Sequence, residues 1–391
     1  MVTGRRLSDT GAALKACIAR HCPPDEDIRT TLAHAENQFV AGDYKQARVT
    51  LQDSAGRNRK FAKHYPVPVS DLLRASSRVD VHLGEVEDYR RTTLGSLDAL
   101  KAGLPATDPR VLAERLEVAD MFAQVGDFDQ ALDIYRKVAR EAKALNLPVL
   151  EGTARLRTVS ADLRVAADAL GTGAEHEAVA EVDALAHDPD PQLASYAFVA
   201  RVIRAQYDAK HGRPQPLEVV MAEMRTRLSG TRPVLIQADP IRMPGRPEAV
   251  TIDDSAPTRD SLTRLPVGSF EGQWVDVSFW IKPDGSVDDV GVLRESKPTV
   301  SYWDKPVLTS VRSRRYAPLK LRAGDPGLLR VERYTYTSFF DRTASESRIP
   351  TRDGQPRVEM LDLSDEPAGA APGTSPAAAP PASASGTPTT G

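Results

Sequence analysis

Two patterns of apolar and polar positions divide this sequence. Over residues 7–230 apolar residues recur at spacings of three and four and alanine is abundant, which predicts one helix after another. Near Ser229-Gly230 the pattern changes, and five prolines follow by residue 257, which excludes helix there. From Trp274 to Ile281 apolar residues alternate with others, which predicts a strand with one buried face. We therefore expect a helical part followed by a β part.

A turn that recurs at a fixed period marks the helical part. Each copy has a glycine that can end one helix in the left-handed conformation, and in the best two copies an aspartate that can cap the next helix. A period of 42 residues predicts stacked helical hairpins. The copies are Gly42-Asp43-Tyr44, Gly84-Glu85-Val86 and Gly126-Asp127-Phe128, and weaker turns at 171–173 and 211–214 continue roughly the same spacing.

Small residues flank the two best turns at equivalent positions and would let paired helices approach closely: Ala35, Ala47, Ala119 and Ala131. With the Gly-Asp-aromatic turn, this pattern resembles tetratricopeptide repeats, most clearly over about 28–62 and 112–146. The usual unit is 34 residues, so a period of 42 implies longer helices or longer connections. The resemblance implies an extended concave surface that binds a protein or peptide segment.

The β part reads in the order strand, strand, helix, strand. Pro283-Asp284-Gly285 predicts a tight turn after Trp274–Ile281, and a second strand follows at about Val287–Glu295. A short helix is expected over Asp304–Arg314, and a long strand over Leu328–Phe340.

Four segments of this region, in the same order and spacing, resemble the TonB C-terminal domain. They are the opening hairpin Gly272–Val287, the strand Val290–Ser296, the helix Asp304–Arg312 and the exit Arg314–Pro318. The resemblance implies a small antiparallel sheet with a helix, and recognition by pairing with a short strand of an outer-membrane receptor. Energy transducers of that family carry an N-terminal membrane anchor and a Pro-rich spacer before the domain, whereas a helical array precedes it here.

Together these patterns predict an α+β multidomain chain, with an α-helical hairpin repeat array (TPR-like) and a small antiparallel β-sheet domain with a helix (TonB C-terminal-like). The last 25 residues contain only Pro, Ala, Gly, Ser and Thr, and such a segment is expected to be disordered. The short apolar run Val358–Leu363 is expected either to add a strand to the β domain or to pack on it. The expected divisions are an N-terminal helix with the cysteine pair (1–24), the repeat array (25–229), a Pro-rich linker (230–269), the TonB-like domain (270–345), a polar extension (346–366) and the disordered tail (367–391).

Charge and length narrow the class of protein. The 391 residues carry 51 Lys and Arg against 54 Asp and Glu, and this balance argues against a dedicated nucleic-acid binder. The sequence contains no stretch of about 20 apolar residues, so it predicts no membrane span. The first ten residues have no apolar core and are not expected to be a signal peptide, although a chain whose leader has been removed would look the same.

The only cysteines, Cys17 and Cys22, lie just before Pro23-Pro24. One pair lacks the ligand count of a structural zinc site. A disulfide between them would favour an oxidising compartment, and two semi-buried thiols are the alternative.

Residue patterns for catalysis are absent from the sequence. His176-Glu177 begins like a zinc-protease motif, but Ala180 stands where the second histidine is required. No Gly-x-Ser-x-Gly motif and no phosphate-binding loop occurs. We therefore expect no enzyme and no cofactor or metal, with an unrecognised site between the domains as the alternative.

Two binding surfaces are predicted instead. Residues on the first helix of each hairpin would line the groove of the array. Most of the candidate groove residues are basic, so an acidic peptide or a carboxylate terminus would suit them as a ligand. An edge of the sheet would accept a partner strand, which we place on Leu328–Phe340. The candidate partner-binding residues are Arg29, Asn37, Arg74, Arg78 and Arg115 in the groove, and Tyr334 and Tyr336 in the sheet.

The sequence thus predicts a non-enzymatic adaptor that binds a protein or peptide partner, such as an outer-membrane or envelope protein, in the periplasm of a Gram-negative cell. The alternatives are a TonB-like energy transducer or transport-associated protein whose anchor is missing from this chain, and a cytoplasmic address.

Overall fold

The fold is taken from a computed structural model, which describes residues 6–166, 171–212, 219, 233–241, 272–296, 303–322, 324–341, 351–352 and 357–364. The predicted tail at 367–391 and most of the predicted linker at 230–269 lie outside these residues. The description below concerns the described residues alone.

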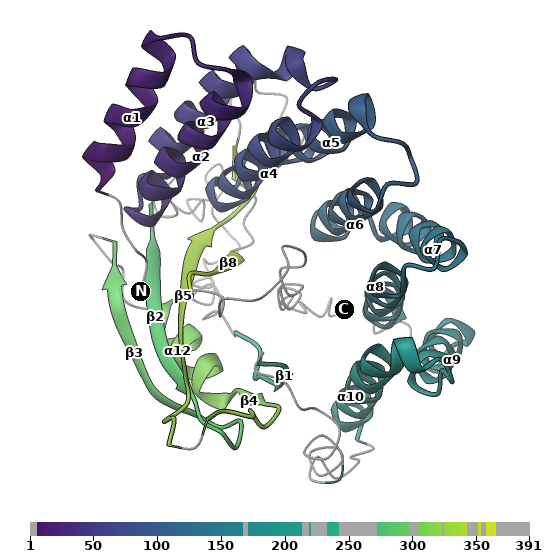
Figure 1. Cartoon of the computed structure of the whole chain (residues 1–391). Helices are drawn as coiled ribbons and strands as arrows, with labels where there is room; N and C mark the ends of the chain where they lie inside the picture. The colour runs from purple at the N-terminus through teal and green to yellow at the C-terminus, as the bar shows by residue number, and fades with distance from the viewer. Residues whose placement is uncertain are drawn as a thin grey trace, which may run out of the picture.

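Antiparallel helical hairpins form an arc (Figure 1), with α4, α6, α8 and α10 on its inner side and α5, α7 and α9 on its outer side. A helical repeat array is thereby confirmed. Its helices are α1 (Leu7–Ala19), α2 (Pro24–Val40), α3 (Tyr44–Asn58), α4 (Pro66–Leu83), α5 (Val86–Gly103), α6 (Pro109–Gln124), α7 (Phe128–Ala144), α8 (Pro148–Ala166), α9 (Gly173–Ala186) and α10 (Ala194–Lys210).

The turns between paired helices have the geometry that the repeat predicts. Gly42 and Gly126 adopt φ angles of 85° and 91°, a region that side chains with a Cβ disfavour. Asp43 accepts a hydrogen bond from the Gln46 amide, and Asp127 accepts one from the Gln130 amide, so each aspartate caps the following helix. The alanines predicted to allow close approach are all buried: Ala35, Ala47, Ala119 and Ala131.

The β domain is built on a four-stranded antiparallel sheet in the order β3-β2-β5-β8, with α12 (Asp304–Ser313) packed on one face. Its strands are β2 (Trp274–Ile281), β3 (Val287–Glu295), β5 (Leu328–Thr337) and β8 (Arg357–Asp362). Small two-stranded sheets pair β1 (Leu235–Gln237) with β4 (Arg315–Tyr316) and β6 (Phe340–Asp341) with β7 (Thr351–Arg352).

Two of these strands lie outside the range 270–345 predicted for this domain. β1 belongs to the stretch taken as a linker, and it pairs with β4 in the β domain. β8 belongs to the stretch taken as a polar extension, and six of its residues pair with β5. The strand predicted over Leu328–Phe340 is divided, because β5 ends at Thr337 and β6 begins at Phe340.

The β domain contacts the helical arc near both ends. Trp274 and Leu361 pack into the cluster formed by α2, α3 and α4, and Phe339 packs with residues of α4, α5 and α6. Ile236 of β1 packs against Phe198 and Val202 of α10. The helical arc and the β domain therefore contact each other near both ends of the arc and together form a ring (Figure 1).

Candidate protein-interaction surfaces

Arg333 of β5 joins the β domain to the end of α2. Its side chain is fully buried, and its two Nη atoms donate to the carbonyl oxygens of Phe39 and Val40 at 2.6 and 2.8 Å. These carbonyls belong to the last turn of the helix, where intrahelical partners run out. Nε and Nη2 of Arg333 also donate to Asp276 of β2 at 2.6 and 2.9 Å. A guanidinium from a distant strand thus caps a repeat helix while its charge is balanced within the sheet.

The same contact uses the first repeat turn. The Arg333 guanidinium lies 3.8 Å from the centre of the Trp274 ring, a cation–π stack. The indole in turn lies against Gly42, where a Cβ atom would come within 2.3 Å of its Nε1. Gly42 is therefore required both by its backbone conformation and by the approach of Trp274.

Thr335, two residues along β5, extends the junction to α4. Its hydroxyl lies 3.0 Å from Tyr44 Oη and 2.8 Å from His82 Nδ1, and all three groups are buried. Burial, with the nearby charge of Arg333, lowers the pKa of His82 to about 3. His82 is therefore a neutral hydrogen-bonding group at physiological pH.

A second arginine repeats the arrangement at α6. Arg357 of β8 donates to the carbonyl oxygen of Gln124 at 3.2 Å, at the end of that helix. It stacks at 3.9 Å on the ring of Phe339 and pairs with Glu359 at 3.2 Å. The Gln124 amide donates to Glu359 at 3.1 Å. Two strands of the β domain thus cap two repeat helices with an arginine that is paired with an acid and stacked on an aromatic ring.

The contact at the other end of the arc is smaller. Gln206 of α10 donates to the carbonyl oxygen of Ile236, and the Ala317 amide donates to that of Val234 at 2.8 Å. Ile236 is fully buried between α10 and the start of the β domain. Residues of the predicted Pro-rich linker therefore connect the helical arc with the β domain.

The candidate groove residues fall into two groups. Arg74 pairs with Glu114 at 2.5 Å and Arg115 with Glu141 at 2.5 Å, while the Asn37 amide donates to Thr10 at 3.2 Å. These three residues join neighbouring helices. Arg29 and Arg78 are exposed, and their role in partner binding stays a prediction.

Tyr334 and Tyr336, the candidates in the sheet, are both buried. Tyr334 accepts from Arg314 at 2.7 Å, and Tyr336 stacks on Trp303 with ring centroids 5.5 Å apart. The expectation that a partner strand pairs with Leu328–Phe340 is wrong, because β5 already lies between β2 and β8. The long strand has the strongest β pattern in this region, but pattern strength does not place a strand at the edge of a sheet.

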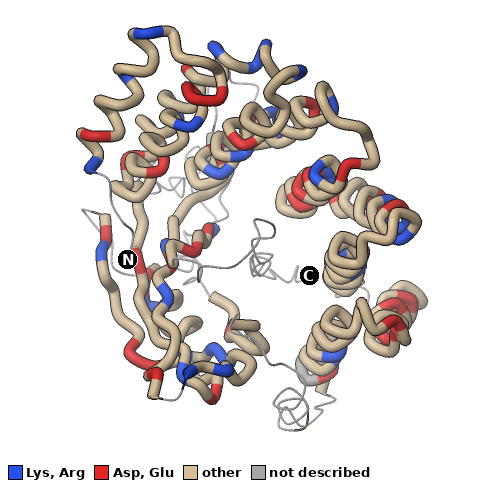
Figure 2. The backbone as a smooth tube through the Cα atoms, in the orientation of Figure 1, with Lys and Arg blue, Asp and Glu red and all other residues tan. Residues whose placement is uncertain are grey.

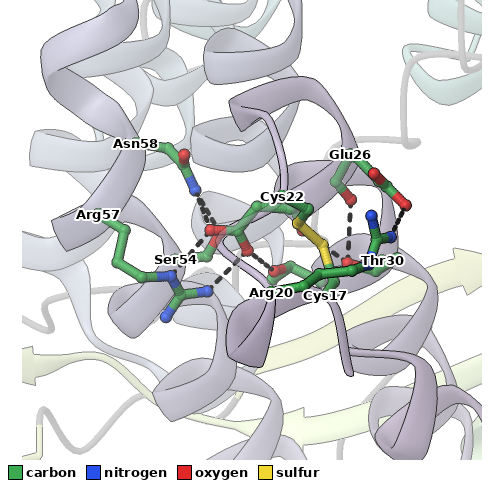
Figure 3. Close-up of a disulfide and its surroundings, with 10 residues drawn as sticks. Cys17, Arg20, Cys22, Glu26, Thr30, Ser54, Arg57 and Asn58 are labelled. Carbon is green, nitrogen blue, oxygen red and sulfur yellow. Dashed lines mark hydrogen bonds and ion pairs between the residues drawn. A yellow bond between two sulfur atoms is a disulfide. The ribbon is translucent and has the colours of Figure 1, made fainter. Parts of the chain in front are cut away.

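Cys17 and Cys22 form a disulfide where α1 gives way to α2, with their Cα atoms 5.2 Å apart. Figure 3 shows it beside the ion pair between Arg20 and Glu26. Glu26 is close enough to the two sulfurs to complete a set of three metal-ligating residues, but bonded sulfurs offer no thiolate ligands.

Nearby, Asp27 of α2 accepts hydrogen bonds from Arg57 at 2.7 and 2.8 Å and from Asn58 at 2.8 Å. Arg57 and Asn58, labelled in Figure 3, lie at the end of α3. These hydrogen bonds hold the pKa of Asp27 below its usual value, against the opposing effect of its burial. This network joins α2 to α3.

Charges of both signs are interspersed along the arc and the sheet (Figure 2). Several ion pairs join residues of successive repeats that are 40 positions apart. Examples are Arg48 with Asp88, Arg74 with Glu114 and Arg157 with Glu117. These charges therefore join successive repeats. None of the helices in the described ranges has the length and apolar character needed to cross a membrane.

Arg333 and Asp276 were not among the residues expected to matter. The sequence contains a pattern that indicates them, because both charged residues lie within strands, on the face opposite the apolar positions and beside Trp274. A solvated face would explain the charges alone, but an adjacent tryptophan indicates a face that is covered.

No protein-family model and no curated protein matches this sequence. Among solved structures, BtubC (BKLC) from P. vanneervenii is 14% identical, with 59% of this chain and 96% of that chain covered and a TM-score of 0.42. A putative kinesin light chain from Podosopora anserina, described as having nearly identical TPR-like repeats, is 15% identical over 53% of this chain and 99% of its own, with a TM-score of 0.40. These scores carry no argument about function, and the assignment of a TPR-like array rests on the hairpins themselves.

Proposed function

We propose that this chain is a non-enzymatic periplasmic adaptor that binds a protein segment, and that its β domain is related to the TonB C-terminal module. The observation that carries the adaptor role is the junction at Arg333. It fixes a repeat array and a β domain as one unit, so that the inner surface of the array and the sheet face a partner together.

The TonB relationship is supported by topology. Strand, strand, helix and strand follow in the order β2, β3, α12 and β5, and α12 covers one face of a sheet with β2 between β3 and β5. β2 (Trp274–Ile281) lies within the segment Gly272–Val287 and β3 (Val287–Glu295) overlaps the segment Val290–Ser296, the two segments that carry the resemblance.

The periplasmic address is supported by the disulfide between Cys17 and Cys22, since disulfides persist in oxidising compartments. To test this address, cells are lysed in acid and free thiols are alkylated. If the chain is exported, Cys17 and Cys22 should be recovered as a disulfide, with neither of them alkylated. Recovery of the chain in the cytoplasmic fraction with both cysteines alkylated would contradict this address.

Photo-cross-linking in Gram-negative cells tests the adaptor role. A photoreactive residue replaces Arg78, which is exposed on α4 one turn from Arg74 on the side that faces α6. The matched control replaces Arg91 of α5, whose side chain is 63% exposed on the outer helix of the same hairpin. We expect one defined protein adduct from position 78 that is absent from position 91 and that recovers this chain when it is tagged in turn. Equal or absent adducts at the two positions would contradict the proposal.

A further inference from the structure

Three side chains that can ligate a metal converge where α1 gives way to α2 (Figure 3). The ligating atoms of Cys17, Cys22 and Glu26 all lie within 4.8 Å of one another, and the described residues contain no other group of this kind. Cys17 is buried, whereas Cys22 and Glu26 are half-buried, so solvent reaches one side of the group. The group raises the number of potential ligands at the cysteine pair from two to three.

Backbone hydrogen bonds hold the two cysteines close together independently of the bond between their sulfurs. His21 has a φ of 52°, so it follows α1 in the left-handed conformation. The His21 amide donates to the Ile18 carbonyl at 3.1 Å, and the Cys22 amide donates to the Cys17 carbonyl at 3.1 Å. These are the two hydrogen bonds of a Schellman motif, which closes the end of a helix through backbone groups alone. We therefore expect Cys17 and Cys22 to stay adjacent when the disulfide is reduced.

Glu26 is positioned by the start of α2. Two prolines, Pro23 and Pro24, fix the entry of the chain into this helix, and the Glu26 amide donates to the Pro23 carbonyl at 3.0 Å. Arg20 Nη2 donates to Oε1 of Glu26, and Oε2 has no hydrogen-bond partner among the described residues. A hydrogen bond to one oxygen of a carboxylate orients the other toward a metal, as groups around metal ligands commonly do.

Two thiolates and a carboxylate suit Zn²⁺. Zinc binds sulfur at about 2.3 Å and carboxylate oxygen at about 2.0–2.2 Å, which places tetrahedral ligand atoms about 3.6–3.8 Å apart. Atoms that lie within 4.8 Å reach this spacing by side-chain rotation, and the sulfurs separate once their bond is broken. Copper(I) is selected by soft sulfur ligands, so the carboxylate favours zinc. Two thiolates, one carboxylate and Zn²⁺ together carry one negative charge, which the Arg20 guanidinium balances.

We propose that Cys17, Cys22 and Glu26 bind Zn²⁺ when the disulfide is reduced, with water in the fourth tetrahedral position. The connection between α1 and α2 then holds either a disulfide or a metal ion. This inference goes beyond the adaptor function and does not depend on it.

A dithiol supplies the two electrons for the exchange. One of its thiolates attacks Cys22 Sγ and releases the Cys17 thiolate, and its second thiolate then closes the reductant to its own disulfide and releases the Cys22 thiolate. The two protons of the dithiol pass to the two cysteines. Zn²⁺ displaces both protons to solvent when it binds.

The exchange would keep α1 attached to α2 in both redox states. Near the start of α1, Thr10 lies 3.1 Å from His34 Nδ1 and accepts from the Asn37 amide at 3.2 Å. Near the end of α1, the disulfide joins Cys17 to the residue just before α2. Reduction removes that second attachment, and zinc would restore it through Glu26, which lies within α2 itself.

Zinc titration of the full chain tests the inference. The chain is reduced with a phosphine, which is oxidised to its oxide, then desalted without oxygen and titrated with Zn²⁺ against a chromophoric chelator. We expect one zinc ion per reduced chain and none bound by the oxidised chain. Glu26→Gln should weaken binding at least about tenfold, since even groups that only orient metal ligands contribute that much. The matched control Asp25→Asn removes an exposed carboxylate from the same turn of α2 and should leave the affinity unchanged.

Two further readouts keep the test decisive. Co²⁺ in place of zinc should give thiolate-to-metal charge-transfer absorption, with ligand-field bands that change in E26Q and not in D25N. Amide exchange in α1 should become faster on reduction and slower again when Zn²⁺ is added. Should E26Q alter the far-UV circular dichroism, Cys22→Ser repeats the titration and should also lose at least about tenfold in affinity.

Equal zinc affinity of wild type and E26Q would overturn the inference, as would a reduced chain that binds no zinc. A stoichiometry of one zinc ion for two chains, seen by native mass spectrometry, would also overturn it, because the cysteines of two copies would then form the site. Unchanged amide exchange in α1 on zinc binding would refute the restored attachment.

Discussion

Replacing Arg333 tests whether the array and the β domain form one unit. Arg333→Ala removes four hydrogen bonds, two to the end of α2 and two to Asp276, and the stack on Trp274. Asp276 is fully buried, and Arg294, which is 45% exposed, remains as its ion-pair partner at 2.6 Å. The variant therefore leaves a buried carboxylate with a partly solvated partner. It also removes the arginine donor from the Phe39 and Val40 carbonyls, of which the Phe39 carbonyl still accepts from the Gly42 amide at 2.9 Å.

The expected loss of stability is about 3–5 kcal/mol, the usual cost of removing one member of a buried ion pair. The double variant Arg333→Met with Asp276→Leu removes both charges together. It should recover part of this loss, because the uncompensated carboxylate is absent while the hydrogen bonds from Arg333 to the end of α2 remain lost.

The three tryptophans of the chain are Trp274, Trp280 and Trp303, all in the β domain. Tryptophan fluorescence thus follows the sheet in urea, and circular dichroism at 222 nm mainly follows the helices. In the wild type we expect coincident transitions, and in R333A the fluorescence transition should come first. The control Arg91→Ala should change neither curve. Coincident transitions in R333A with a loss below about 1 kcal/mol would refute the reasoning.

Three further predictions follow from individual residues. Gly126→Ala should lower the stability by about 1–2 kcal/mol through its left-handed backbone alone, since nothing lies within 4 Å of the new Cβ. Gly42→Ala should cost about 1–3 kcal/mol more and shift the tryptophan emission, because it displaces Trp274. Equal losses in urea denaturation would contradict the close approach of Trp274 to Gly42. Because the pKa of His82 is lowered to about 3 from an ordinary 6.5, its contribution to stability should be fully present above about pH 6.5 and be lost as the pH falls toward 3. His82→Gln should flatten that part of the stability profile between pH 4 and 8, and an unchanged slope would argue against a buried neutral imidazole. Replacing Cys17 and Cys22 together by alanine should lower the local stability of α1 by about 2 kcal/mol, as expected for a short closed loop, and unchanged amide exchange in α1 would show that the disulfide does not hold it.

Local signals in the sequence predicted much of the fold. Gly42 and Gly126 end their helices as the repeat requires, because a left-handed residue followed by an aspartate cap is set by neighbouring residues. The bounds of β2 and β3 also follow from alternation and a tight turn. These features depend on contacts within a few residues.

The candidate sites depended on contacts between residues about 300 positions apart, which no local pattern contains. Arg333 reads as one solvated charge in a strand until the end of α2 is known to lie against it. β1 has three residues between prolines, too few for an alternating pattern, and it exists because β4 and α10 lie on either side of it. The edge of the sheet was misplaced for the same reason, because β8 pairs across a connection of about 20 residues.

Photo-cross-linking in Gram-negative cells from position 78, with position 91 as the matched control, tests the central claim most directly. The account predicts one defined protein adduct from position 78, which is exposed on the inner helix α4, and none from position 91, which is exposed on the outer helix α5. Equal adducts at the two positions, or no adduct at either, would contradict a partner bound at the inner side of the arc.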